Sequence, residues 1–352
     1  MSSFASSFLR QSVGIDVSSR SLDLCFATEG NDREIRFGKS HKVVNQLSGF
    51  EQMMIWLSQQ GCDLQEVVFV MEATGIYYER CAQWLDQKGY KVVVLLPNKA
   101  KAFTKSLNIK TKSDRVDAML LARMGCERKL SLWQPLAPIY KNLRQVSRHR
   151  QNLIQKRTMA KNQLHAAQNE APICETVIES IQIEITNLNA LIKRMDQAIK
   201  KLMQSDEQAS KNLELLCSIP SVGWASAIHL LAETAGFTAF RNQRQLISYA
   251  GFDVVQKQSG SSLNAPQRIS KRGNARIRRA LYFPALTIRK SVPHLENLYQ
   301  RIYAKNPQTK MKSVVAIQRK ILCIAYQIIK TQTEFDPDKL GQKKCTETSV
   351  AA

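Results

Sequence analysis

The chain has 352 residues, enough for two or three domains that each bury a core of their own. Its 51 Lys and Arg against 29 Asp and Glu give a net charge of +22, which is typical of proteins that bind the phosphate backbone of nucleic acid. No apolar stretch approaches membrane-spanning length, and the eight cysteines show no metal-binding spacing, which excludes a membrane protein, a disulfide-stabilised domain and a zinc site. We therefore expect a soluble protein of a reducing cytoplasm.

The first part of the chain alternates strand-like and helix-like patterns. We predict strands at 12–17, 21–28, 34–44, 67–72 and 91–96, and helices at 47–59, 77–88 and 113–125. Pro97 ends the last strand, and Thr111 is the candidate cap of the last helix. Three strands that can form a meander, followed by alternating strands and helices, favour a ribonuclease-H-like α/β sheet. No GxGxxG motif indicates a dinucleotide-binding fold.

Four acidic residues stand at the ends of these elements. Asp16 follows the apolar run 13–15, and Glu72 follows the apolar run 67–71. Asp114 and Asp117 are three residues apart, so they share one face of the predicted helix. Alone, Asp16 is compatible with a plain turn and Asp114 with a helix start. Together the four carboxylates predict a site for Mg²⁺ or Mn²⁺, which prefer hard oxygen ligands.

The middle of the chain, about 139–204, is helical throughout. Residues 139–165 contain seven Lys and Arg and no acidic residue. Apolar residues recur every three or four positions from 177 to 195, which predicts an antiparallel helical hairpin or a short coiled coil. Such a segment acts as a dimerisation or spacing arm, or as a solvated linker.

The last folded part, about 210–330, is strongly basic. Residues 219–227 resemble the turn of a helix-hairpin-helix, in which backbone N–H groups hold a phosphate. Between 257 and 320 there are 15 Lys and Arg and a single acid, Glu296. A helix after Asn274 would bury Ile277, Leu281 and Leu286. We predict that phosphates bind to the basic residues of this segment, namely Arg268, Lys271, Arg272, Arg276, Arg278 and Arg279.

Five ordered segments resemble one family. The sequences at 14–17, 71–77, 112–118, 258–262 and 269–281 are similar to the motifs of the DEDD group of bacterial insertion-sequence transposases, the "one-ten" family, which includes the pilin-gene invertase. The similarity is spread over most of residues 12–290, in the order and spacing of the family. Any one of these segments alone would be weak support.

The resemblance implies a domain organisation. It implies an α/β N-terminal domain, RNase-H-like and similar to the Holliday-junction resolvase RuvC, a helical coiled-coil middle, and a mainly α C-terminal transposase domain that carries a serine. We accordingly predict the acidic catalytic domain at 1–130, the arm at 131–205, the serine-bearing domain at 206–332 and a disordered tail at 333–352.

The resemblance also implies a reaction. In the family, the acidic tetrad acts with a serine that attacks DNA and becomes linked to it, and a structured bridge RNA guides recombination. The matching positions here are Asp16, Glu72, Asp114 and Asp117 for the tetrad and Ser259 for the serine; Ser261 and Ser262 are the alternatives. The implied partners are element and target DNA, a bridge RNA and further copies of the chain, as a homodimer and as a tetramer in synapsis, in a bacterial cytoplasm.

Other functions compete with this one. A junction-resolvase-like endonuclease would use the metal-bound carboxylates to hydrolyse DNA, but this function leaves the 257–281 segment without a chemical role. A non-catalytic nucleic-acid-binding protein would have no need of an intact tetrad. A tyrosine recombinase using Tyr249 or Tyr282 would not need the carboxylates either. The sequence therefore favours a transposase that joins strands through a serine.

Overall fold

The computed structural model describes residues 8–109, 111, 113–259, 263–305 and 307–338. The chain divides into two compact units, Met1–Pro135 and Leu136–Ala352. We predicted a first boundary at 130/131 and a second at 205/206; the separation of an arm from a C-terminal domain stays a prediction, because the arm and the basic segment belong to one unit.

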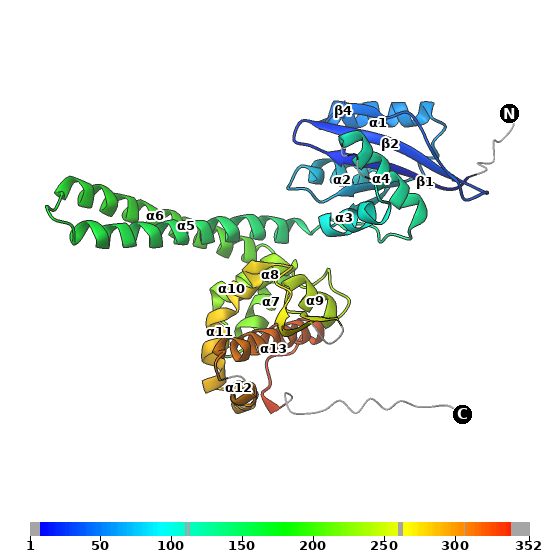
Figure 1. Ribbon diagram of the computed structural model, residues 1–352. Coiled ribbons are helices and arrows are strands. Elements are labelled where there is room, and N and C mark those ends of the chain that lie inside the picture. The colour runs from blue at the N-terminus through cyan, green and yellow to red at the C-terminus, as the bar shows by residue number, and fades with distance from the viewer. Residues whose placement is uncertain (1–7, 110, 112, 260–262, 306, 339–352) are drawn as a thin grey trace, which may run out of the picture. The chain divides into compact units, whose positions relative to one another are not determined.

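The N-terminal unit is built on a mixed sheet (Figure 1). Its strands are β1 (Phe8–Val17), β2 (Ser21–Gly30), β3 (Ile35–Phe37), β4 (His41–Val44), β5 (Val68–Glu72) and β6 (Lys91–Leu95). The order across the sheet is β3-β2-β1-β5-β6, and β4 also pairs with β2. Strand β2 is antiparallel to β1, β3 and β4, whereas β5 is parallel to β1 and β6. The predicted meander and mixed α/β sheet are confirmed, although the strand predicted at 34–44 is two short strands.

Helices cover both faces of this sheet. They are α1 (Leu47–Gln59), α2 (Tyr78–Gln87), α3 (Pro97–Ser106) and α4 (Asp114–Glu127). Apolar side chains of α1 and α2 form a core with one face of the sheet, and those of α3 and α4 form smaller cores with the other. Helix α3 was not predicted. The cap of α4 was predicted wrongly: the Ser113 hydroxyl, not Thr111, accepts a hydrogen bond from the Val116 N–H at 3.3 Å.

The C-terminal unit is mainly helical and contains one β-hairpin. Its helices are α5 (Pro138–Gln168), α6 (Glu175–Gln204), α7 (Glu207–Cys217), α8 (Trp224–Thr234), α9 (Gln243–Ala250), α10 (Ala275–Ala280), α11 (Tyr282–Thr287), the 3₁₀ turn η1 (Ile288–Lys290), α12 (Pro293–Lys305) and α13 (Lys310–Thr331). The hairpin consists of β7 (Val254–Ser259) and β8 (Leu263–Ile269).

Helices α5 and α6 form an antiparallel pair (Figure 1). Arg150 pairs with Asp196, and Arg157 donates to Asn189 at 2.9 Å. A residue later in α5 thus contacts a residue earlier in α6, as expected for antiparallel helices. Leucine, isoleucine and alanine side chains fill the seam between the two helices. The first turns of α5 instead bury Tyr140 in the core of the C-terminal unit.

That core joins α7, α8, α9, α10, α11 and α13. Ile277 and Leu281 are fully buried in it and Leu286 is partly buried, as predicted. Phe335 also packs on it, and the Phe335 N–H donates to the Ser218 hydroxyl at 2.9 Å. Of the tail predicted at 333–352, residues 339–352 lie outside the described residues.

Two compositional predictions can be compared with the described residues. The seven cysteines among them are free thiols, and burial raises the pKa of Cys81 to about 12. No helix in the described part of the chain is long and apolar enough to cross a membrane.

Candidate active site

The candidate site begins with the contact between strand β1 and helix α4. Alternation along β1 places Ser12, Gly14 and Asp16 on the face that α4 covers. A Cβ atom at Gly14 would overlap the carbonyl oxygen of Ala118, and a Cβ atom at Gly125 would overlap the Ser12 side chain. Because both positions are glycine, the helix lies directly on the strand. This close packing sets the start of α4 beside the end of β1.

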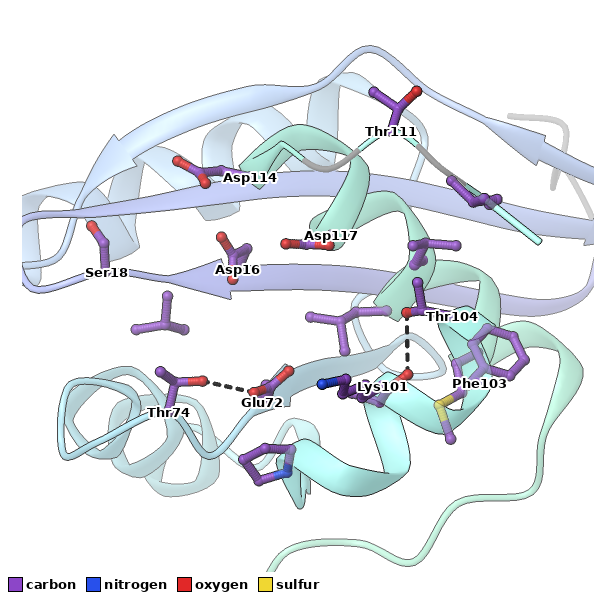
Figure 2. A pocket seen from close by; sticks show the side chains of 17 residues that line it. Asp16, Ser18, Glu72, Thr74, Lys101, Phe103, Thr104, Thr111, Asp114 and Asp117 are labelled. Carbon is purple, nitrogen blue, oxygen red and sulfur yellow. Dashed lines mark hydrogen bonds between the residues drawn. The ribbon is translucent and has the colours of Figure 1, made fainter. Parts of the chain in front are cut away.

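The four predicted carboxylates line one cavity in this unit. The cavity has a volume of about 720 Å³. Asp16 enters it from the end of β1, Glu72 from the end of β5, and Asp114 and Asp117 from the first turn of α4 (Figure 2). Since β1 and β5 are parallel neighbours, their carboxyl ends meet at the same edge of the sheet. The structure thus brings the whole predicted tetrad together.

Burial and the neighbouring carboxylates both disfavour the charged form of Asp16. Burial, followed in decreasing order by the charges of Asp117, Asp114, Asp23 and Glu72, raises the pKa of Asp16 from 3.8 to about 6. Asp23 was not predicted as part of the site; it is the β2 residue that pairs with Asp16 across the antiparallel ladder. A cation that enters the cavity would stabilise the ionised form of these carboxyl groups.

Several side chains missed by the sequence reasoning support or line the cavity. The Thr74 hydroxyl donates to Glu72 Oε1 at 3.0 Å and so orients that carboxylate. Asn45 Nδ2 donates to the backbone oxygens of Ser18 at 2.9 Å and Tyr77 at 3.1 Å, which ties the turn after β1 to the loop after β5. Lys101 is the only basic side chain among the described lining residues. Only the fold brings these distant segments together.

The donor set of the cavity fits a hard divalent cation. All four predicted ligands are carboxylates, and their mutual repulsion is the condition that a bound cation relieves. Within the described part of the chain, no three Asp, Glu, His or Cys side chains are close enough to form a closed metal cluster. A cation bound in this cavity would therefore take part of its coordination from water and substrate phosphate, as Mg²⁺ commonly does.

The predicted serine lies in the other unit. Ser259 is the last residue of β7, and its backbone pairs with Leu263 of β8. No strand was predicted from the sequence in this segment, so the hairpin was missed. The alternatives Ser261 and Ser262 lie outside the described residues.

The base of this hairpin is held by close backbone packing. Gly251 has a φ of +70°, and a Cβ atom at Gly273 would overlap the Tyr249 carbonyl oxygen and the Gly251 nitrogen. The Asn274 N–H donates to the Tyr249 carbonyl at 2.7 Å, and the Ser270 hydroxyl donates to Asp253 at 2.6 Å. These contacts hold the start of β7 and the end of β8 together.

The six predicted phosphate-binding residues have different surroundings. Arg268, Lys271, Arg272, Arg276 and Arg279 are exposed. Arg278 is partly buried, and its guanidinium donates to the Ala250 carbonyl at 2.8 Å, which joins α10 to the end of α9. Arg278 therefore stabilises the fold, in addition to the phosphate binding predicted for it.

A buried carboxylate connects the arm to the start of α10. Glu233 is 1% exposed and accepts two hydrogen bonds from Arg148 of α5, at 2.7 and 2.8 Å, and one from Asn274 at 2.7 Å. Burial alone would raise the pKa of Glu233, but these hydrogen bonds lower it below its ordinary value. The sequence reasoning missed Glu233 because α8 carries it into the core as an isolated acid.

Two family models match the chain in succession. Residues 13–171 match a transposase model of the DEDD IS110 type, and residues 213–300 match the transposase model of the IS116/IS110/IS902 family. The chain belongs to the IS110 family of transposases.

Individual relatives agree with this membership. The IS110-family chain is 29% identical over 329 residues to the pilin gene-inverting protein of Moraxella lacunata, covering 92% of this chain and 97% of that protein. It is 22% identical over 231 residues to the transposase for insertion sequence element IS1111A of Coxiella burnetii, covering 58% and 61%. A solved structure of T. thermophilus RuvC in complex with a Holliday junction substrate matches 33% of this chain and 97% of that chain at 12% identity, with a TM-score of 0.25, too low to support an inference. Membership in the family makes this chain a DNA-recombining enzyme.

Proposed function

We propose that this IS110-family transposase cuts and rejoins DNA strands through a covalent link to Ser259, with Asp16, Glu72, Asp114 and Asp117 holding Mg²⁺ or Mn²⁺. The observation that carries the proposal is the convergence of four carboxylates from three separate segments on one cavity. Such a cluster is unfavourable without a cation, as the raised pKa of Asp16 indicates. A bound divalent ion would polarise a phosphodiester and stabilise the charge on its oxygens.

The strand-cutting step is a transesterification. Ser259 Oγ forms a bond to the scissile phosphorus, the bond from phosphorus to the leaving deoxyribose oxygen breaks, and the hydroxyl proton of the serine ends on that oxygen or in water. In the second step, a deoxyribose hydroxyl of the partner strand attacks the phosphoserine and releases Ser259. The number of phosphate ester bonds is unchanged, so no nucleotide triphosphate is required.

The basic residues and the partners follow from the same proposal. Exposed cations around the hairpin base would hold the phosphates of the strand whose bond is cut. The pilin gene-inverting relatives favour inversion of DNA segments as the outcome, with excision and insertion as the alternatives. By resemblance to the family, the proposal includes a bridge RNA as guide, a homodimer that becomes a tetramer in synapsis, and action in a bacterial cytoplasm.

Two sets of variants test the proposal on labelled DNA that carries the element ends. Asp16→Asn, Glu72→Gln, Asp114→Asn and Asp117→Asn should each abolish cleavage, as should EDTA. With the wild type, a denaturing gel should show a protein–DNA adduct that survives boiling in detergent. The adduct should disappear in Ser259→Ala and persist in Ser261→Ala and Ser262→Ala. Cleavage without any adduct would instead indicate hydrolysis by a junction-resolvase-like endonuclease.

A further inference from the structure

One aromatic side chain of the C-terminal unit is largely exposed. Phe283, in α11, is 73% exposed, the largest exposed fraction of any large hydrophobic side chain among the described residues. Because most of this side chain is not removed from water, the fold gains little stability from it. Its ring meets Tyr282 edge to face, with centroids 5.4 Å apart. Most of the Phe283 side chain therefore stays accessible to a ligand although its ring contacts Tyr282.

Phe283 lies on a cavity of about 380 Å³ with cations at its rim. The lining combines apolar and aromatic groups, including Tyr282 and Met311, with Lys271, Arg278 and Arg279. None of the described lining residues is acidic. Apolar and aromatic side chains beside positive charges suit a ligand that carries both a planar ring and an anionic group.

The charge of this region favours nucleic acid over a second copy of the chain. Between 257 and 320 there are 15 Lys and Arg and one acid, so two such faces would repel each other. Nucleobases attached to phosphates provide both required groups. The end of β8, Ile269, lines the same cavity, and the other strand of that hairpin ends at Ser259. Val254 pairs with Ile269 at the base of the hairpin, and Ser259 lies five residues further along β7, a distance of about 17 Å along the strand. A DNA strand held at Ser259 is therefore within reach of the cavity.

We propose that Phe283 and Tyr282 form a stacking site for an unpaired base of the DNA strand that is being cut, with Lys271 and Arg279 holding the adjoining phosphates. This inference rests on the proposed function, which supplies DNA as the substrate and Ser259 as the residue at which the strand is cut. Recombination requires strands to separate before they exchange, and a stacking site holds a base that has lost its pair.

The test measures binding of the full-length chain to a fluorescein-labelled single-stranded DNA 20-mer by anisotropy, at several salt concentrations. Phe283→Ala should weaken binding about 5- to 100-fold, Phe283→Leu should weaken it nearly as much, and Phe283→Trp should restore it. The slope of log affinity against log salt should not change in these variants, because a phenyl ring neutralises no phosphate. Lys271→Gln should reduce that slope by about 0.7. The matched control is Ile183→Ala on α6, which removes an apolar side chain that is 62% exposed and should not alter binding.

The possible outcomes separate this inference from the proposed function. Failure of the wild type to bind any DNA would contradict the proposed function. Wild-type binding that Phe283→Ala leaves unchanged would overturn only the stacking site. Full binding by Phe283→Leu would indicate a plain apolar contact. A weaker self-association of Phe283→Ala, with DNA affinity intact, would assign the face to a second copy. A loss confined to an RNA 20-mer would assign it to a guide.

Discussion

Replacing Asp16 by asparagine should stabilise the N-terminal unit while it abolishes DNA cleavage. In the folded chain, burial and the charges of Asp117 and Asp114 raise the pKa of Asp16 from 3.8 to about 6. The folded state therefore keeps a proton that the unfolded state has already lost. Ionising Asp16 above pH 6 thus lowers the free energy of unfolding. Asparagine has a similar shape and no charge, so Asp16→Asn removes this penalty.

The magnitude follows from the shift. A difference of about 2 pKa units corresponds to at most about 3 kcal/mol. Asp16 is only partly buried, so solvent screens the repulsion and we expect about 1 kcal/mol. The sign fixes the pH window. Wild-type stability should fall relative to that of Asp16→Asn as pH rises from about 4 to about 7, and the difference should be constant above that.

The measurement is urea unfolding of the full-length chain, followed by tryptophan fluorescence, at about pH 4.5 and about pH 7.5. Trp56, Trp84 and Trp133 report on the N-terminal unit, and a Trp224→Phe background removes the signal of the other unit. Glu51→Gln serves as the control, because Glu51 is exposed on α1.

A divalent cation provides an independent check. Mg²⁺ that binds the folded state should stabilise the wild type through mass action and should stabilise Asp16→Asn much less. Equal stability of the two proteins at both pH values, or a less stable variant at pH 7.5, would refute the reasoning.

Two further substitutions test close packing in the N-terminal unit and a buried ion pair in the C-terminal unit. Gly14→Ala should destabilise the N-terminal unit by about 1–3 kcal/mol and reduce cleavage at least tenfold, because the new methyl group would overlap the Ala118 carbonyl oxygen and push α4 away from β1. Urea unfolding measures the first effect and the cleavage assay the second. The control is Gly223→Ala, where a Cβ atom meets no neighbour. Glu233→Ala should destabilise the C-terminal unit by about 2–4 kcal/mol, since Arg148 loses its buried partner. An unchanged unfolding midpoint, read from the single tryptophan of that unit, would contradict this.

Local patterns in the sequence were enough to predict most of the N-terminal unit. The helix 47–59 was located to the residue because its apolar positions recur with helical period, and Asp16 and Glu72 were assigned to strand ends because an apolar run stops at each. Helix α3 was missed because Pro97 was taken only as a strand terminator. Proline is also favoured in the first turn of a helix, where its missing N–H is not needed.

Contacts between distant segments were not predictable in this way. Nothing local to Asp23 indicates that it will pair with Asp16, because the register of β1 and β2 decides it. The β7–β8 hairpin was missed for a similar reason. Its strands are polar and lack clear alternation, and the packing of Gly273 on Gly251 that closes its base joins residues 22 positions apart.

The site combines two groups of residues with opposite effects on stability. The carboxylates repel one another and weaken the folded state, whereas Gly14 and Gly125 allow the close packing of α4 that brings those carboxylates together. Loss of cleavage should therefore occur in two distinguishable ways. Substituting Asp16 should abolish activity and raise stability, as expected where a functional group is held at the expense of the fold. Substituting Gly14 should reduce activity and lower stability. Measuring both quantities for each variant separates residues that perform the chemistry from residues that position them, even where cleavage alone gives the same result.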